Sequence, residues 1–341
     1  KTWRRRGFFA AVHLQDFSQG GIRAHEHTFD GPKADRFRLM RATNSNLSPI
    51  FCIYDDPERK TDRLLNEATR TRPVEATFDN VIHRLWPVGD QHIIKGLQEA
   101  MADKTLYIAD GHHRYETSLA YRDEMRALMG SSKGQQPFDF TMMFLANIRD
   151  EGMIVLPTHR VLSKEACHGI NVDEAIEDIG EYFDVQPFEI NCSDLSAESL
   201  RLTQELARAG ERNVSYALVL PKCRAFLLTL KDGVDVNELN DDEAVAPEVK
   251  QLDVTILHSY LITQGWLGNP EIELDDQDVI YLKDAEEVLQ RMSTCKYGAA
   301  FLMNPTRIEQ VCEVAQAGQR MPHKSTYFYP KVVTGMVMRD M

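Results

Sequence analysis

The residue types best suited to chemistry are concentrated in one short segment, residues 108–119, which reads IADGHHRYETSL. Apolar residues at its start predict a buried strand, and the later apolar spacing predicts a helix to about residue 129. His112, His113 and Arg114 then lie on the opening turn of that helix. Such a turn attracts anions through unpaired N–H groups and the helix dipole. An arginine fork and two imidazoles add donors, so the segment predicts a phosphate site.

Asp110 and Gly111 form the junction between the predicted strand and helix. The acid ends the strand, and the glycine would let a phosphate approach the backbone. Asp-Gly is also a common turn, and His-His-Arg at a helix start is equally compatible with a solvated surface. Both interpretations stay open when only the residues are considered.

A second cluster, RAHEHT at residues 23–28, brings together His25, Glu26 and His27. In a strand the two histidines would point to one face and Glu26 to the other. Glu26 could serve as a general base. The histidines could bind a metal only with a third ligand from elsewhere in the chain. An exposed polar turn is an equally good interpretation.

Two later segments contain further candidate anion ligands. His159 and Arg160 end a predicted strand in LPTHRVL, and a second His-Arg pair favours convergence on one anion. Lys324 and Ser325 precede the aromatic triplet YFY, and they could close a phosphate pocket. Lys324 is not part of a P-loop, because no glycine precedes it at the required spacing. The simpler interpretation of this tail is a strand that packs on a sheet.

Composition excludes several classes of function. The 341 residues are 43% hydrophobic and 27% charged, as in ordinary globular proteins. With 52 acids and 39 bases the net charge is −13, which argues against a nucleic-acid partner. No apolar stretch reaches the ~18 residues of a membrane span. Serine hydrolase, zincin, Rossmann and protein-kinase signatures are also missing from the sequence.

The cysteines and the first residues indicate the compartment. Six cysteines occur without CxxC spacing, so we expect reduced thiols in a cytoplasmic protein, with neither a zinc site nor a disulfide framework. No signal peptide is visible. The chain opens at Lys1 without methionine, and we expect a natural segment to precede it.

The helices and strands expected from the sequence position these residues. Their mixture predicts an α/β fold of mixed α+β type. We divide the chain into 1–162 and 163–341, and the second part is a C-terminal α/β region whose tail (321–331) could return to the site. A hairpin of strands is expected over 138–147 and 153–157, and another over 214–220 and 224–230. The other expected strands cover 8–17, 22–28, 49–54, 83–88, 105–109, 279–282 and 298–303. The expected helices cover 35–43, 62–71, 91–102, 113–129, 172–182, 200–209, 285–292 and 306–317, with a long helix ending near 261.

The whole chain resembles a bacterial and archaeal family of unknown function. The resemblance rests on AHEHT (24–28), PKADR (32–36), YIADGHHRYETSLAYR (107–122), LPTHRVL (156–162), FLMNPT (301–306) and MPHKSTYFYPK (321–331). The DGHHR segment also resembles the nucleotide-phosphate motif of the ParB/sulfiredoxin-like superfamily. This resemblance implies that residues 1–162 form a ParB/sulfiredoxin-like nucleotide-binding core. In sulfiredoxin a catalytic cysteine stands where this chain has His112. ParB proteins carry a helix-turn-helix and a basic surface that this acidic chain lacks. The archaeal free-serine-kinase branch matches best at the motif.

The resemblance to the kinase branch implies roles for individual residues. Glu26 would be the catalytic base, and Asp110 would face Mg²⁺ or the acceptor hydroxyl. Gly111 through Arg114, with His159, Arg160, Lys324 and Ser325, would hold the phosphates of ADP or ATP. The expected activity is phosphate transfer from a nucleotide to a small hydroxylated metabolite such as serine.

Two other classes of function remain as alternatives. One is a nucleotide-binding switch or scaffold without turnover, which would use the same anion site. The other is a metal-dependent hydrolase built on His25, His27 and His159, which we rank last. The sequence is also compatible with a homodimer.

Overall fold

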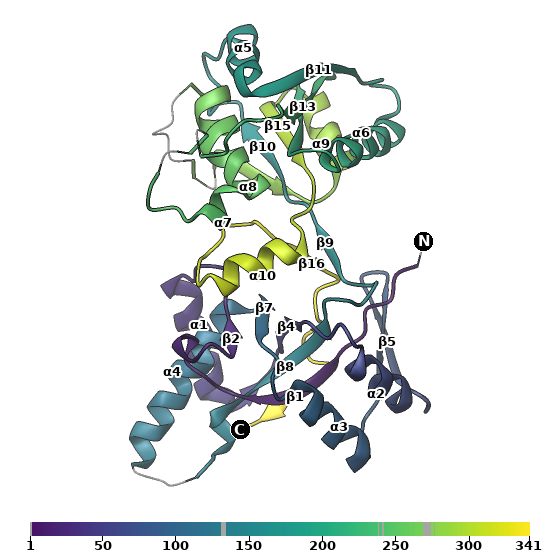
Figure 1. Cartoon of the computed structure of the whole chain (residues 1–341), viewed down its shortest axis with the longest axis vertical. Helices are drawn as coiled ribbons and strands as arrows, with labels where there is room; N and C mark the ends of the chain where they lie inside the picture. The colour runs from purple at the N-terminus through teal and green to yellow at the C-terminus, as the bar shows by residue number, and fades with distance from the viewer. Residues whose placement is uncertain (1, 131–133, 238, 241, 269–273, 276) are drawn as a thin grey trace. The chain divides into compact units, whose positions relative to one another are not determined.

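The computed structural model describes residues 2–130, 134–237, 239–240, 242–268, 274–275 and 277–341. It contains two compact units, coloured by residue number in Figure 1. The first comprises Lys1–Ile154 and Phe328–Met341, and the second comprises Val155–Tyr327. Each unit combines helices with β-sheet, which confirms the mixed α/β class.

These units differ from the predicted division into 1–162 and 163–341 at both ends of the second part. His159 and Arg160 belong to the second unit, whereas the division predicted from the sequence puts them in the first. The last residues of the chain, from Phe328 onward, belong to the first unit.

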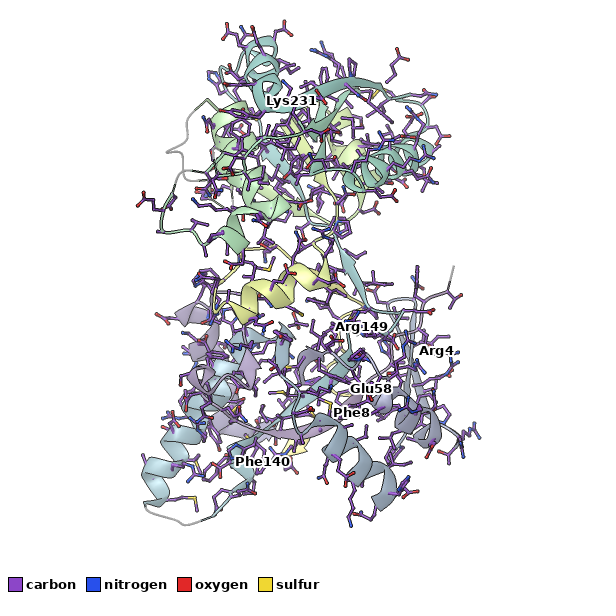
Figure 2. The ribbon with its side chains drawn as sticks, viewed as in Figure 1. Arg4, Phe8, Glu58, Phe140, Arg149 and Lys231 are labelled. Carbon is purple, nitrogen blue, oxygen red and sulfur yellow. A yellow bond between two sulfur atoms is a disulfide. The ribbon has the colours of Figure 1, made fainter. Side chains whose placement is uncertain are left out.

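The first unit is built on a five-stranded mixed sheet in the order β1-β8-β4-β7-β2. Its strands are β1 (Phe8–His13), β8 (Phe140–Asn147), β4 (Ile50–Tyr54), β7 (Leu106–Asp110) and β2 (Ile22–Arg23). All five residues of β4 are buried, as expected for a central strand covered on both faces. Phe8 and Phe140, labelled in Figure 2, each begin a strand of the antiparallel β1–β8 pair, so they lie at its opposite ends.

Helices and short strands complete the first unit. The helices are α1 (Asp30–Thr43), α2 (Lys60–Ala68), α3 (Gln91–Met101) and α4 (His112–Met129). α1 packs against α4, and α2 packs against α3 (Figure 1). β5 (Val74–Phe78) and β6 (Val81–Leu85) form a separate hairpin, and β3 (Ser45–Asn46) pairs with β17 (Arg339–Asp340). The helix and strand that flank residue 111 are thus anchored in the main sheet and in the α1–α4 pair.

The second unit contains a six-stranded antiparallel sheet in the order β11-β13-β12-β15-β10-β14. Its strands are β11 (Phe183–Glu189), β13 (Arg224–Leu230), β12 (Ser215–Leu220), β15 (Tyr297–Met303), β10 (His159–Ser163) and β14 (Val279–Leu282). Every residue of β12 is buried. Tyr216 and Leu218 pack in one hydrophobic cluster and Ala217 and Val219 in another, so both faces of the sheet are covered.

The covering helices of the second unit are α5 (Val172–Tyr182), α6 (Leu195–Gly210), α7 (Pro247–Lys250), α8 (Asp253–Ile256), the π-helix η3 (Leu257–Trp266), α9 (Ala285–Ser293) and α10 (Ile308–Gln316). The expected long helix ending near 261 is therefore α8 continued by η3. The hairpin expected over 214–220 and 224–230 is confirmed as β12–β13.

Two sequence predictions about strands are wrong. β8 and β9 (Ile154–Leu156) do not form a hairpin, because β8 pairs with β1 and β4 while β9 pairs with β16 (Tyr327–Tyr329). The pairing partners come from distant parts of the chain, which local turn chemistry does not indicate. The strand expected over 22–28 ends at Arg23, so His25 is buried while His27 is exposed, and the two do not share one face.

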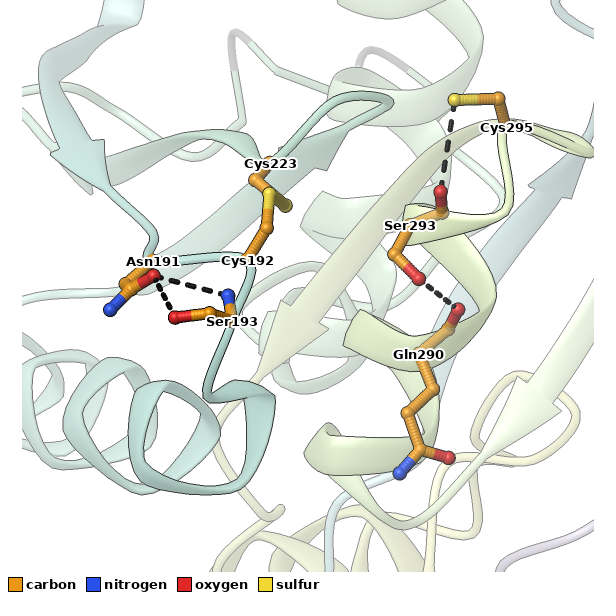
Figure 3. Close-up of a disulfide and its surroundings, with 7 residues drawn as sticks. All are labelled: Asn191, Cys192, Ser193, Cys223, Gln290, Ser293 and Cys295. Carbon is orange, nitrogen blue, oxygen red and sulfur yellow. Dashed lines mark hydrogen bonds between the residues drawn. A yellow bond between two sulfur atoms is a disulfide. The ribbon is translucent and has the colours of Figure 1, made fainter.

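The expectation that all six cysteines are reduced is also wrong. Cys192 and Cys223 form a disulfide (Figure 3). Cys192 follows β11, and Cys223 lies in the turn between β12 and β13. Since Glu189 is paired with Arg224 in the β11–β13 register, the fold brings the two cysteines together across 31 residues of sequence. Their spacing alone does not predict this contact.

Candidate functional site

The segment around Gly111 has the predicted strand, turn and helix. β7 ends at Asp110, and α4 begins at His112. Gly111 has a φ of 100°, a conformation that favours glycine. A Cβ there would lie 2.9 Å from Nε and Nη2 of Arg114. The positive φ therefore favours glycine at this turn, and a larger residue would also displace the Arg114 guanidinium that folds back over it.

Both oxygens of the Asp110 carboxylate are paired with cations. Oδ2 lies 2.7 Å from Nη2 of Arg114, one helical turn later. Oδ1 lies 2.6 Å from Nζ of Lys331, which comes from the C-terminal segment of the same unit. The carboxylate thus holds two cations next to the N-terminus of α4, where a phosphate would also be attracted by the helix dipole.

The Arg114 guanidinium is fixed on its other side by the loop before β4. Nη1 donates to Oγ of Ser48 at 2.6 Å and to the carbonyl oxygen of Pro49. Burial lowers the pKa of Arg114, and the charge of Asp110 opposes that effect. Arg114 is therefore a rigid cation with partly committed donors.

His112 connects the helix start to Glu26. Nε2 of His112 accepts a hydrogen bond from the backbone N–H of His25, so the ring proton is assigned to Nδ1. Nδ1 lies 3.2 Å from Oε2 of Glu26. Burial opposes ionisation of Glu26, but this contact and the electrostatic influence of His112, His25 and Lys331 outweigh it and lower its pKa to about 2. Glu26 is therefore an ionised carboxylate near neutral pH.

His113 has a different set of contacts from His112. Its Nε2 accepts from the backbone N–H of Phe29 at 2.9 Å, and its ring stacks on the Phe29 ring. Burial lowers the pKa of His113. Because Phe29 precedes α1, this neutral imidazole links the start of α4 to the start of α1.

His159 and Arg160 lie in the second unit and are enclosed there. Nδ1 of His159 accepts from the backbone N–H of Met303, and burial lowers the pKa of His159 to about 4. Arg160 is fully buried, and its Nε donates to Nε2 of His258 at 3.0 Å. Its other donors reach the carbonyl oxygens of Thr158 and Lys324. Both side chains thus connect parts of the second unit, and their assignment to a phosphate stays a prediction.

Lys324 and Ser325 also belong to the second unit. Ser325 is buried, and its Oγ donates to the carbonyl oxygen of Pro322 at 2.5 Å. The carbonyl oxygen of Ser325 accepts from Thr306. The phosphate role of these two residues stays a prediction.

Lys331 and Arg5 are site residues that sequence reasoning missed. Lys331 ends the MPHKSTYFYPK segment, in which only Lys324 and Ser325 were selected. Arg5 donates from Nη2 to the carbonyl oxygen of Pro330, directly before Lys331. Lys331 lies in a segment that the sequence already marks as a candidate. The contact between Arg5 and Pro330 spans 325 positions, and no local feature of the sequence indicates it.

A metal site is not preformed in the part of the chain that the structure describes. No group of three or more His, Cys, Asp or Glu side chains there could hold a metal ion, and this includes His25 and His27. Mg²⁺ commonly takes one or two carboxylates together with phosphate oxygens. Asp110 and Glu26 carry such oxygens, and their assignment to Mg²⁺ stays a prediction. Among the described residues no helix is both long and apolar enough to cross a membrane.

Comparison with known proteins connects the chain to one family. The family model described as "Protein of unknown function (DUF1015)" matches residues 1–255. No curated protein matches the chain. A mutant of free serine kinase in complex with AMP is 12% identical, with a TM-score of 0.41, and the match covers 98% of this chain and 90% of the other.

Two further solved structures give similar values. A conserved hypothetical protein from Pyrococcus furiosus is 13% identical with a TM-score of 0.40, covering 96% of this chain and 93% of its own. SbnI with a C-terminal truncation, from Staphylococcus aureus, is 10% identical with a TM-score of 0.38, covering 96% and 85%. At these TM-scores the similarities say nothing about activity.

Proposed function

The chain belongs to the DUF1015 family, and we propose that it is a nucleotide-dependent kinase that phosphorylates a small hydroxylated metabolite, with serine as the first acceptor to test. The observation that carries this proposal is the Asp110 carboxylate held between Arg114 and Lys331 at the N-terminus of α4. The resemblance of DGHHR to the free-serine-kinase motif supports the same choice.

The site has the charges that phosphoryl transfer needs. This reaction depends on positioning and on neutralising the phosphates more than on covalent chemistry by the protein. In a chain with a net charge of −13, Arg114 and Lys331 provide a local cationic pair beside the helix N-terminus. We assign them to the phosphate oxygens, with backbone N–H groups of the first turn of α4. Mg²⁺, held by Asp110 and Glu26, would add charge neutralisation when bound.

Glu26 is the residue we assign to the acceptor. In the transfer, the acceptor oxygen forms a bond to the terminal phosphorus while the bond to the leaving nucleotide breaks. The hydroxyl proton passes to the carboxylate of Glu26. With a pKa of about 2, Glu26 is a weak base in the free protein, although it is ionised and can orient a hydroxyl. Bound phosphates would counter the cations that lower this pKa and so make Glu26 a stronger base.

Variants of the two carboxylates test the proposal. Glu26→Gln should reduce the transfer rate by about 10²–10⁴-fold, the usual contribution of a general base, and leave the affinity for nucleotide in the absence of Mg²⁺ close to wild type. Asp110→Asn should reduce both the rate and the affinity, because Asp110 also positions Arg114 and Lys331. Glu67→Gln, on an exposed part of α2, is the matched control. An unchanged transfer rate in both site variants would refute the proposal.

The non-catalytic switch remains the second candidate, because Asp110, Arg114 and Lys331 would suit it equally. The position of Glu26 favours the kinase, since a scaffold that only binds nucleotide has no need of an ionised carboxylate beside the phosphate site. Tight nucleotide binding without any transferred phosphate would favour the switch.

A further inference from the structure

The Arg5 side chain in the first unit is held in an aromatic environment. Its guanidinium carbon lies 4.6 Å from the centre of the Phe51 ring and 5.6 Å from that of Phe144. Nη2 donates to the carbonyl oxygen of Pro330 at 2.6 Å. The two rings and this hydrogen bond fix the plane of the guanidinium, as cation–π contacts do for buried arginines.

One donor group of Arg5 is not used. Nη1 is buried, and it has no hydrogen-bond partner within the residues that the structure describes. Buried polar groups are nearly always paired, and leaving a charged donor unpaired is especially costly. Such an atom therefore marks a place where a ligand group is expected to bind.

The nearby acids do not neutralise Arg5 directly. Burial lowers the pKa of Arg5 to about 10, while the charges of Asp150 and Asp110 oppose that shift. Arg5 is therefore charged at neutral pH. Oδ2 of Asp150 pairs with Arg6 at 3.2 Å, and both oxygens of Asp110 already contact other cations. An additional anion would complete the charge balance.

Arg5 also lies next to the site described above. The Pro330 carbonyl that it contacts belongs to the residue before Lys331, and Lys331 reaches Asp110. Arg5, Arg114 and Lys331 thus supply three cations against the carboxylates of Asp110 and Glu26. Arg5 differs from Arg114, whose donors on both Nη atoms contact Asp110 or the 48–49 loop.

We infer that Nη1 of Arg5 binds an oxyanion of the substrate and thereby selects anionic ligands at this site. The inference rests on the proposed function. It adds that a substrate carries an oxyanion that Arg5 binds, which the proposed function alone does not require. The oxyanion has two sources, a phosphate of the nucleotide or a carboxylate on the phosphate acceptor. An arginine donor suits both, since each presents planar or tetrahedral oxygens to an N–H group.

Calorimetric titration of the full chain separates the two sources. The probes are MgADP, inorganic pyrophosphate, L-serine and ethanolamine, which keeps the hydroxyl and amine of serine but lacks the carboxylate. L-serine and ethanolamine are titrated in the presence of saturating MgADP. The variants are Arg5→Gln, which removes the charge and is too short to reach the Pro330 carbonyl from the same backbone position, and Arg5→Lys, which keeps the charge but loses the fork. Arg4→Gln is the matched control, because Arg4 is the exposed neighbour labelled in Figure 2.

We expect Arg5→Gln to weaken one class of probe by about 10- to 100-fold, the effect of a hydrogen bond to a charged group. Equal weakening of MgADP and pyrophosphate would identify the nucleotide phosphate. Weakening of L-serine, with ethanolamine unaffected, would identify an acceptor carboxylate. Arg5→Lys should lie between wild type and Arg5→Gln for that class of probe alone, whereas loss of a merely structural contact to Pro330 would weaken all probes alike.

Three results would overturn the inference. The first is that Arg5→Gln binds every probe with the same affinity as Arg4→Gln. The second is that Arg5→Gln loses affinity equally for L-serine and ethanolamine while its pyrophosphate binding is unchanged. The third is that no probe binds to the wild-type chain. Thermal unfolding midpoints of all variants show whether a loss of affinity is caused by misfolding. If Arg5→Gln is misfolded, the affinities of Arg5→Lys test the inference instead. Binding that depends on Arg5 without any phosphomonoester product would show that the proposed kinase activity, and not this inference, has failed.

Discussion

Replacement of Lys331 by methionine should reduce the free energy of nucleotide binding much more than it reduces the free energy of unfolding. Methionine keeps most of the length and the apolar stem of lysine and removes its charge. The variant deletes the contact between Nζ and Oδ1 of Asp110, which is 2.6 Å long. If Lys331 also contacts phosphate, as we propose, the same change deletes a charge-assisted hydrogen bond to the ligand.

The expected magnitudes of the two effects differ. The side chains of Lys331 and Asp110 are 40% and 32% exposed, so solvent screens their pair, and such pairs contribute about 0.2–1 kcal/mol to folding. Asp110 also keeps its contact with Arg114 at 2.7 Å, so it is not left unpaired. A hydrogen bond to a charged group contributes about 1.5–3 kcal/mol, which corresponds to a loss in affinity of about 10- to 150-fold.

The assay compares Lys331→Met with Lys95→Met, which is the same chemical change at an exposed position of α3. Urea unfolding gives the change in folding free energy, and titration with MgADP gives the change in affinity. We expect Lys331→Met to lose affinity with a nearly unchanged unfolding midpoint, and Lys95→Met to bind as wild type. The reasoning is refuted if Lys331→Met binds MgADP as tightly as Lys95→Met does.

Three further predictions follow from individual contacts. Arg114→Ala should weaken MgADP binding by about 2–4 kcal/mol in titration, as expected for loss of a desolvated charge partner, and unchanged affinity would remove the phosphate from this motif. The lowered pKa of Glu26 means that its ionised form stabilises the fold above the unfolded pKa of about 4.3, and that this stabilisation is lost as the pH falls toward 2. The difference in unfolding free energy between wild type and Glu26→Gln should therefore shrink between about pH 5 and pH 2, and a constant difference would contradict it. The Cys192→Ser, Cys223→Ser double variant should lose about 3–4 kcal/mol of unfolding free energy, from the 31-residue separation in the chain-entropy model. Alkylation of all six cysteines without reductant would show instead that the disulfide is absent.

The local part of the site could be predicted because its signals are local. An apolar run, a glycine and an amphipathic stretch specify β7, the turn at Gly111 and α4 within a few residues of each other. Asp110 and Arg114 are neighbours for the same reason, since they are four positions apart across that turn. The hairpin β12–β13 was predictable on similar grounds.

The remaining features depend on contacts between distant positions. Lys324 and Lys331 occur in one run of cations and aromatic residues, and only the fold shows that Lys331 belongs to the first unit. Arg5 reaches the site from the opposite end of the chain. The Cys192–Cys223 pair likewise follows from the β11–β13 register, which no spacing rule supplies.

The burial of polar side chains such as His159 and Arg160 could not be predicted from residue type. His159 and Arg160 have the chemistry of a phosphate ligand, yet their side chains are enclosed in the second unit. Arg160 contacts the π-helix through His258 and the residue before Ser325 through its carbonyl oxygen. A sequence pattern shows which interactions such a pair could make, whereas the fold determines which partners its side chains contact.

The most direct test of the proposed kinase is ³¹P NMR of the purified chain with Mg²⁺, each of ADP, ATP and CTP, and a pool of hydroxylated metabolites that includes serine. We predict a new phosphomonoester resonance with wild-type protein and none with Asp110→Asn. Division of the pool would then identify the acceptor. Nucleotide resonances that broaden or shift without any new ester would contradict the kinase and favour a nucleotide-binding switch.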